Sequence, residues 1–453
     1  MGADFTELLY FFNNHKDTMT RGKKRFIKKV FLPGLISLVL VFLIPSCKDN
    51  ASAPDTGIIT VWHHTGRPAE QLVFQAQVDR FNQTQKQFKI VPTFIPEGDY
   101  NTQIQAAAAA GKLPDILDLD GPFLANYAWK GHLQAMDHLL DPAVKKDLLP
   151  SILAQGTYHG HLYAVGTFDS GLGLYANKKI LAAAGITLPK NLSPPWPVTT
   201  FENHLHTLRK YDEDGQVLDL RLDYRGEWYT YAFSPVLQSA GADLIDRHTF
   251  QTAAGILNGT QAVAVLQKMQ KWLRKGYVDP NTDSSSFVNE KVAFSWCGHW
   301  EFPRYRESLA DNLILLPLPD FGNGSKTGMG SWCWAITSNC KSPEMAMLFI
   351  HFLLRKEEIL AMCEANGAVP ATRSAIAASP LYQKNGPLHP FVAGLQSAVP
   401  RPRTPAYPVI TSAFQEAFQD IRHGVDVQQA LDNAVSIIDQ DIRDNMGYPY
   451  FHK

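Results

Sequence analysis

The sequence is poor in cysteine, balanced in charge and short of long apolar runs. Five of its 453 residues are cysteine, with no Cys-x-x-Cys pair and no Cys/His group of zinc-like spacing. The net charge of −1 argues against the basic surface by which proteins hold nucleic acid. A P-loop and a Gly-x-Ser-x-Gly elbow are missing, which argues against an ATPase and a serine hydrolase. We therefore expect no metal, no cofactor and no nucleic-acid partner.

The one long apolar run lies near the N-terminus, at residues 30–44, after a cluster of basic residues between positions 23 and 29. Its length suits the core of a signal peptide better than a membrane-spanning helix. Ser46-Cys47 at its end resembles a bacterial lipobox, so we predict a signal peptide over 1–47 with lipid on Cys47. A plain secretory signal and an uncleaved anchor are the alternatives. Residues 48–57 are polar and predict a flexible tether.

Strand-like and helical patterns alternate after the tether. Strand-like segments at 58–62, 88–94 and 115–119 alternate with helical periodicity at 70–82, 100–110 and 123–130. This order predicts an α/β fold with a largely parallel sheet, which places ligands at the carboxyl ends of its strands. Helices dominate later, at 200–211, 259–275, 342–354, 357–365, 409–423 and 427–446. About 400 residues after the signal suggest roughly two domains.

Several motifs in order resemble the extracellular solute-binding proteins of ABC sugar importers, the maltose-binding-protein-like class. They are Ile58-Ile59-Thr60-Val61-Trp62, Gly111-Lys112-Leu113-Pro114-Asp115, Asn289-Glu290-Lys291-Val292-Ala293-Phe294, Gly298-His299-Trp300 and Gly367-Ala368-Val369-Pro370. The resemblance implies a two-lobe periplasmic-binding-protein fold of class II type, with a hinge and an interlobe cleft. We place the first lobe at 58–168 and 294–344, and the second lobe at 169–293 and 345–453. The first crossing between lobes is expected near 166–171.

The same resemblance implies a function. The chain would be the substrate-binding component of a carbohydrate importer, capturing a mono- or oligosaccharide by lobe closure and delivering it to the permease subunits of an ABC transporter. It would be an exported monomer that a lipid anchor holds at the membrane, facing the periplasm or the cell exterior. Two alternatives are a lipoprotein for a polyol or glycerophosphodiester, and a glycoside hydrolase using Asp118 with Asp120 or Glu97 with Asp99.

A sugar site needs aromatic rings for C–H faces and polar groups that match hydroxyls, because unmatched buried polar groups discriminate against analogues. Strand ends and the resemblance together select our ligand-binding candidates, which are Asp120, Asp169, Trp228, Trp300, Trp332, Arg373, His64 and Glu97. Six of them have a structural alternative: core packing for the tryptophans, a helix cap or turn for Asp120, a hinge hydrogen bond for Asp169, and a salt bridge for Arg373. Trp62 and Trp334 are expected in strands and core.

Two further pairs invite a metal or a disulfide. Adjacent residues of a strand point to opposite faces, so we do not expect His63 and His64 to share a metal. Cys333 and Cys340 form either a disulfide or two buried free thiols.

Overall fold

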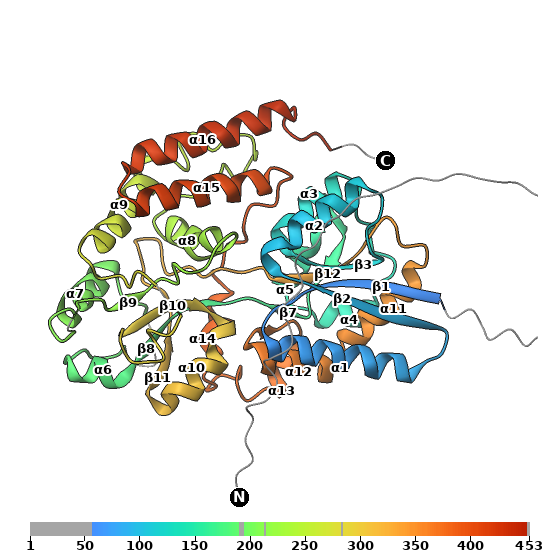
Figure 1. The fold of residues 1–453 in the computed structure, drawn as a ribbon, viewed down its shortest axis with the longest axis horizontal. Helices are drawn as coiled ribbons and strands as arrows, with labels where there is room; N and C mark the ends of the chain where they lie inside the picture. The colour runs from blue at the N-terminus through green and yellow to red at the C-terminus, as the bar shows by residue number, and fades with distance from the viewer. Residues whose placement is uncertain (1–56, 190–193, 213, 282–283, 451–453) are drawn as a thin grey trace, which may run out of the picture. The chain divides into compact units, whose positions relative to one another are not determined.

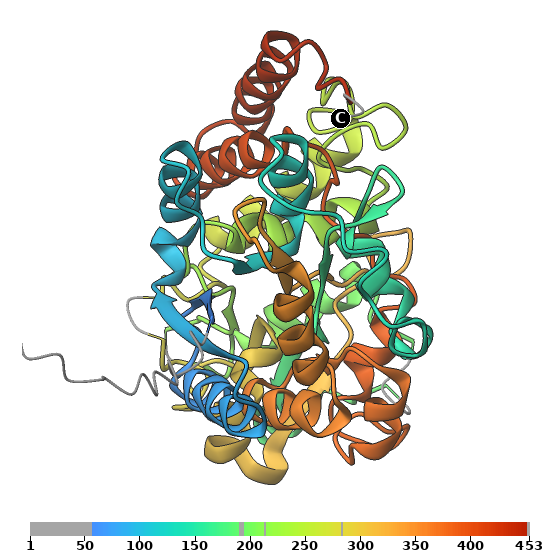
Figure 2. The ribbon, with the colours of Figure 1, turned by 90° about the vertical axis from the view of Figure 1, so that its right-hand side faces the viewer.

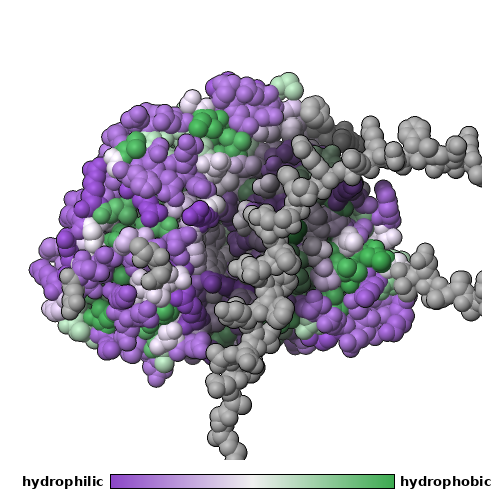
Figure 3. All heavy atoms as spheres, viewed as in Figure 1, coloured by the Kyte–Doolittle hydropathy of each residue, from purple (hydrophilic) through white to green (hydrophobic). Residues whose placement is uncertain are grey.

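The structure is a computed structural model that describes residues 57–450, except 190–193, 213 and 282–283 (Figure 1). The predicted signal peptide, with Cys47, lies outside the described residues. None of the described helices is long and apolar enough to cross a bilayer. On the face drawn in Figure 3, hydrophilic residues predominate and hydrophobic residues form small separate areas.

The first sheet has five strands in the order β2-β1-β3-β12-β6. Its parallel part is β1 with β2 and β3, whereas β12 runs antiparallel to β3 and β6, so the predicted parallel character holds for one side of the sheet. The strands are β1 (Gly57–His64), β2 (Phe88–Ile95), β3 (Ile116–Asp120), β6 (Ala164–Val165) and β12 (Trp332–Ile336). Helices α1 (Pro68–Thr84), α2 (Glu97–Ala109) and α3 (Leu124–Trp129) follow the first three strands, as the periodicity predicts.

Apolar alternation explains why these segments form strands and helices. In β1 the inward residues Ile59 and Val61 are almost fully buried, and α1 covers them with Phe74 and Val78. Pro68 begins α1, where a missing N–H costs no intrahelical hydrogen bond. The alternating burial of β1 therefore anchors the strand in the core and places His63 and His64 at its carboxyl end.

The second sheet has four strands in the order β11-β8-β10-β9. Strand β8 runs antiparallel to β10 and β11, and β10 runs parallel to β9. The strands are β8 (Leu172–Asn177), β9 (Leu218–Asp219), β10 (Phe294–Gly298) and β11 (Leu313–Leu316). The predicted first-lobe segment 294–344 thus contains two strands, β10 and β11, that pair in the second sheet. The apolar sequences of β10 and β11 fit either sheet, and their hydrogen bonding to β8 decides that they belong to the second sheet.

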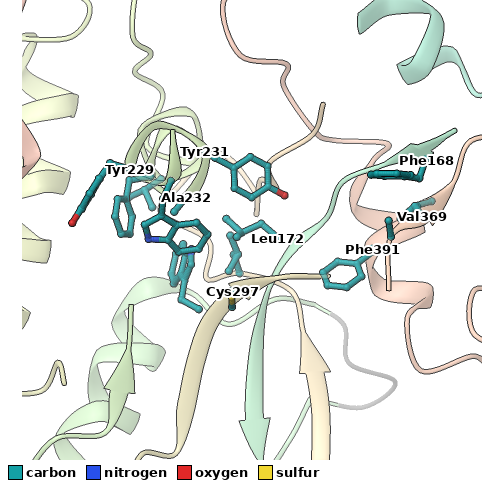
Figure 4. Packing of buried hydrophobic residues seen from close by; sticks show 14 of the residues in the cluster. Phe168, Leu172, Tyr229, Tyr231, Ala232, Cys297, Val369 and Phe391 are labelled. Carbon is teal, nitrogen blue, oxygen red and sulfur yellow. The ribbon is translucent and has the colours of Figure 1, made fainter. Parts of the chain in front are cut away.

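The chain passes between the sheets through short paired segments. Strand β7 (Phe168–Asp169) pairs with β13 (Val369–Pro370) where we predict the first crossing. Figure 4 shows Phe168 and Val369 together on one side, and Leu172, Tyr231 and Cys297 by the second sheet. These residues belong to one continuous buried cluster.

Two helices of the predicted second lobe pack against the first sheet's helix α1. They are α11 (Pro343–Leu353) and α12 (Lys356–Asn366), and both ribbon views show α12 beside α1 (Figure 1, Figure 2). Gln77 of α1 donates to the carbonyl of Glu358 at 3.0 Å. The lobe boundaries themselves stay a prediction. The contact of Gln77 with Glu358 favours α12 in the first lobe, and the pairing of β10 with β8 favours β10 in the second lobe.

Helices cover the second sheet and the C-terminal part. The largest are α8 (Trp228–Ser239), α9 (Thr260–Arg274), α15 (Tyr407–Arg422) and α16 (Val427–Asp444), of which α15 and α16 pack together. The shorter helices are α4 (Pro142–Asp147), α5 (Pro150–Gly156), α6 (Lys178–Ala183), α7 (Val198–Leu208), α10 (Phe302–Leu309), α13 (Arg373–Ala378) and α14 (His389–Gly394). A small hairpin joins β4 (Thr157–Tyr158) to β5 (His161–Leu162). Cys333 and Cys340 are buried free thiols, which decides between the two readings of that pair.

Candidate functional site

Four of the predicted site residues meet at one edge of the first sheet. His64 ends β1 and Asp120 ends β3, and the two strands are parallel, so their carboxyl ends lie at the same edge. Trp332 begins the antiparallel strand β12 directly opposite Asp120. Glu97 begins α2, just after β2 ends at the same edge. The sequence rule that ligands bind at carboxyl ends thus selects neighbouring side chains here.

His64 and Trp332 are stacked face to face. Their ring centroids lie 3.8 Å apart with an interplanar angle of 9°. His64 Nδ1 lies 2.6 Å from Asp118 Oδ2, and His63 Nε2 lies 3.5 Å from the same oxygen. Our expectation that the two histidines separate to opposite faces is wrong, because both side chains reach Asp118 at the end of the strand.

Glu97 is exposed to solvent, yet protein crowds around it. This desolvation, together with the negative charges of Asp120 and Glu70, raises the pKa of Glu97 to about 7, against the opposing effect of Arg67. Near neutral pH this group both accepts and donates hydrogen bonds, as a sugar hydroxyl requires.

Asp120 pairs with an arginine that the sequence analysis did not select. Arg401 Nη2 lies 3.1 Å from Asp120 Oδ1, and Arg401 Nη1 lies 2.5 Å from Glu227 Oε1. The arginine side chain is 5% exposed and also donates to the carbonyl of Gly330 at 3.1 Å. Glu227 precedes α8 and Asp120 ends β3, so one guanidinium links the carboxyl end of β3 to the start of α8. A carboxylate has about four acceptor positions, so Asp120 retains capacity for a ligand hydroxyl.

Aromatic rings gather beside the second sheet. Trp300 lies 5.9 Å from Trp228 and 5.8 Å from Tyr231, centroid to centroid, and its Nε1–H donates to the hydroxyl of Tyr224 at 3.2 Å. Trp300 lies over Gly298, where an added Cβ would come within 2.1 Å of the indole. Trp228 is 5% exposed and begins α8, which favours the core packing given as its alternative, and its ring contacts the half-buried Trp300 and Tyr224.

Arg67 connects this aromatic cluster to the edge of the first sheet. The residue precedes α1, and its Nη2 donates to the hydroxyl of Tyr224 at 3.1 Å and to Glu301. Glu301 is fully buried and also accepts from the Tyr224 hydroxyl at 2.8 Å. Arg67, Tyr224 and Trp300 therefore form a chain of hydrogen bonds that runs from one sheet's strand ends to the other's.

Two predicted residues lie apart from these contacts. Asp169 is 1% exposed and accepts from the backbone N–H of Ser170 at 2.7 Å and of Gly330 at 3.0 Å, which is the hinge role given as its alternative. Burial raises the pKa of Asp169 above its ordinary value. Arg373 is exposed and donates to the carbonyls of Lys146 and Leu148, each at 2.8 Å. Both geometries favour structural roles.

The residues that the sequence analysis missed share one property. Each contacts a partner that is far away in the sequence. The residues are Arg401, Glu227, Tyr224 and Arg67, and 281 positions separate Arg401 from Asp120. The available signal was weak: a charged residue in the proline-rich stretch 400–408, and polar neighbours of Trp228. No local periodicity encodes such pairs.

Two of the four carboxylates considered for glycoside cleavage have protein partners: Asp118 contacts His64, and Asp120 pairs with Arg401. The half-buried indoles of Trp300 and Trp332 offer apolar faces. The exposed carboxyl of Glu97 and the guanidinium of Arg67 offer hydrogen-bond partners for hydroxyls.

Comparison with known proteins agrees with this geometry. The model of the family "Bacterial extracellular solute-binding protein" matches residues 76–390. The maltooligosaccharide ABC transporter solute-binding lipoprotein of Streptococcus pneumoniae is 21% identical, covering 93% of this chain and 99% of its own length. The maltotriose-binding protein of Pyrococcus abyssi is 20% identical over 81% of this chain and 78% of its own.

A solved structure shows the same fold. The GacH receptor of Streptomyces glaucescens, solved unliganded and with acarbose, superposes with a TM-score of 0.72 at 21% identity, covering 86% of this chain and 98% of the receptor. The fold is therefore the predicted two-lobe α/β type. Because the family model covers well over half of the sequence, this chain belongs to the bacterial extracellular solute-binding proteins.

Proposed function

We propose that this protein is the substrate-binding component of an ABC-type carbohydrate importer. The observation that carries the proposal is the pair of half-buried indoles, Trp300 and Trp332, each beside polar groups that match hydroxyls. Indole faces bind the C–H faces of sugars, and Glu97, Asp120 and Arg67 supply acceptors and donors around them. The sugars named for the relatives point to a mono- or oligosaccharide ligand.

The mechanism is capture by closure. A ligand that contacts groups from both sheets favours the state in which those groups are close, because it binds that state more tightly. The chain itself already makes two such bridging contacts, one between Arg67 and Tyr224 and one between Arg401 and Asp120. The loaded protein, a monomer, then docks on the permease subunits, and lipid on Cys47 keeps it near them by raising its effective concentration.

The test begins with the ligand. Mass spectrometry of mildly purified protein should detect a bound sugar, and calorimetry against mono- and oligosaccharides should give a tight complex. The ligand should leave unchanged, since this protein binds it and does not cleave it. New reducing ends on chromatography would instead support a glycoside hydrolase, and selective binding of a glycerophosphodiester would replace the sugar.

Site variants then locate the ligand. Trp300→Ala and Trp332→Ala should each weaken sugar binding by more than about tenfold, or roughly 1.4 kcal/mol. Trp129→Ala is the matched control, because Trp129 is also half-buried but packs on Tyr448 and donates to the carbonyl of Pro449. Unchanged affinity in both site variants would overturn this site.

The anchor is tested separately. Cys47→Ser should release the protein from membranes into the soluble fraction, while its sugar affinity stays that of the wild type. Retention of the variant on membranes would contradict lipid attachment at Cys47 and favour an uncleaved N-terminal anchor.

A further inference from the structure

A buried carboxylate, Asp118, lies beneath the sugar-facing edge of the first sheet without facing the proposed ligand. Its residue is 2% exposed and stands two positions before Asp120 on β3, so the two side chains share a face of the strand. Its nearest partner is His64, with Nδ1 2.6 Å from Asp118 Oδ2. Burial lowers the pKa of His64 to about 4, so the imidazole is neutral at pH 7 and can donate its Nδ1–H to Asp118.

His64 is enclosed on every side that these contacts describe. One ring face lies 3.8 Å from Trp332, and the other lies 4.8 Å from His63 at an angle of 11°. His63 in turn stacks on Phe74 at 4.1 Å. At the Nε2 edge, a Cβ on Gly66 would lie 3.2 Å away, and Gly66 has the left-handed φ of 59°. The imidazole therefore has a single orientation, set by Asp118 and its packing.

Trp332 is the half-buried end of this stack, and the other three rings are at most 4% exposed. The free volume beside His63, His64 and Asp118 is about 10 Å³, enough for about one water. An imidazole ring has no room to turn there. The indole of Trp332 stacks on this fixed imidazole and also meets the ring of Tyr100 edge-on, at a centroid distance of 5.4 Å.

A metal ion is the competing explanation of this cluster. His63, His64 and Asp118 each offer a ligand atom, all within 4.8 Å of one another, and zinc accepts this ligand set. A ring nitrogen binds a metal through the lone pair in its ring plane. The two imidazole planes are inclined by only 11°, which is a poor arrangement for two in-plane lone pairs that must converge on one ion beside Asp118.

We propose that Asp118 and His64 are positioning residues that hold the Trp332 indole ready for the sugar. The inference rests on the proposed function. A sugar that binds a fixed indole does not have to immobilise it, and immobilising one side chain costs about two- to tenfold in affinity. The carboxylate thus contributes to binding without touching the ligand.

The test combines affinity with a direct probe of Trp332. Asp118→Asn should weaken sugar binding by about two- to tenfold, and should cause no further loss in a Trp332→Ala background. In protein labelled with 5-fluorotryptophan, the fluorine resonance assigned by Trp332→Phe should shift or broaden in sugar-free Asp118→Asn. Saturating sugar should sharpen it again. His64→Gln should reproduce these effects and serves if Asp118→Asn does not fold.

Asp115→Asn is the matched control. Asp115 lies near the start of the same strand and binds the backbone and hydroxyl of Thr60 at 2.8 and 2.7 Å, at the opposite edge of the sheet. It should leave the affinity and the Trp332 resonance unchanged. Three results would overturn the positioning role. The first is an unchanged Trp332 resonance in Asp118→Asn, and the second is a loss of affinity from Asp118→Asn that is just as large in the Trp332→Ala background. The third is a wild-type protein that binds one equivalent of zinc and loses it in Asp118→Asn.

The two proposals fail in different ways. If no sugar binds the wild-type protein, the proposed function is wrong, and the fluorine resonance still decides whether Asp118 fixes Trp332. If sugar binds and Trp332→Ala retains full affinity, the positioning role is wrong while the function stands.

Discussion

Arg401 offers the sharpest test of how the two sheets are held together. Its buried guanidinium contacts Asp120 at 3.1 Å and Glu227 at 2.5 Å, and the two carboxylate side chains are only 12% and 18% exposed. Arg401→Met keeps most of the unbranched stem of the side chain but leaves two poorly solvated carboxylates without their cation. Breaking a buried pair in this way costs about 3–5 kcal/mol, because the remaining charge is uncompensated.

Urea unfolding of the sugar-free protein measures this cost as a fall in the unfolding free energy at unchanged slope. The matched control is Arg403→Met, two positions along, where an exposed arginine donates to the carbonyl of Ala154. That variant should lose less than about 1 kcal/mol, as exposed contacts do. Adding Asp120→Asn and Glu227→Gln to Arg401→Met should recover at least half of the loss, since no unpaired charge remains.

The reasoning is refuted if Arg401→Met unfolds within about 1 kcal/mol of the wild type, or no lower than Arg403→Met. Failure of the triple variant to recover stability would show that packing of the arginine stem, and not its charge, supplies the effect.

Three further predictions concern single side chains. Gly298→Ala should displace the indole of Trp300 and weaken sugar binding by more than about tenfold in calorimetry, whereas Gly98→Ala, with open space at its Cβ, should not. Burial lowers the pKa of His299 from 6.5 to about 4, so its contribution to stability is present above pH 6.5 and is lost as the pH falls toward 4. Relative to His299→Gln, the wild type should lose on the order of 3 kcal/mol across that interval in urea unfolding, and parallel curves would contradict this. The pKa of Glu97 is raised to about 7, and its ionised carboxylate is the stronger acceptor for a sugar hydroxyl, so sugar affinity should rise with pH through neutrality. Glu97→Gln should remove that dependence.

The sequence alone was sufficient for the fold class and for much of the first sheet's functional edge. Alternating strand and helix periods predicted β1 to α3 within a few residues, because burial on one face leaves its mark every second or every third to fourth position. Parallel strands end at a common edge, so His64, Glu97 and Asp120 were predicted together from where their strands stop. The ordered motifs led to the family that the comparison confirms.

Only the tertiary structure decided which distant groups meet. Residues 294–316 were predicted in the first lobe, yet hydrogen bonding to β8 puts both of their strands in the second sheet. His63 and His64 are the last two residues of β1, yet both of their side chains reach Asp118. Arg401 finds Asp120 across 281 positions. Local sequence carries the period of an element, whereas ion pairs and ring stacks depend on side-chain directions that packing sets after the elements have come together.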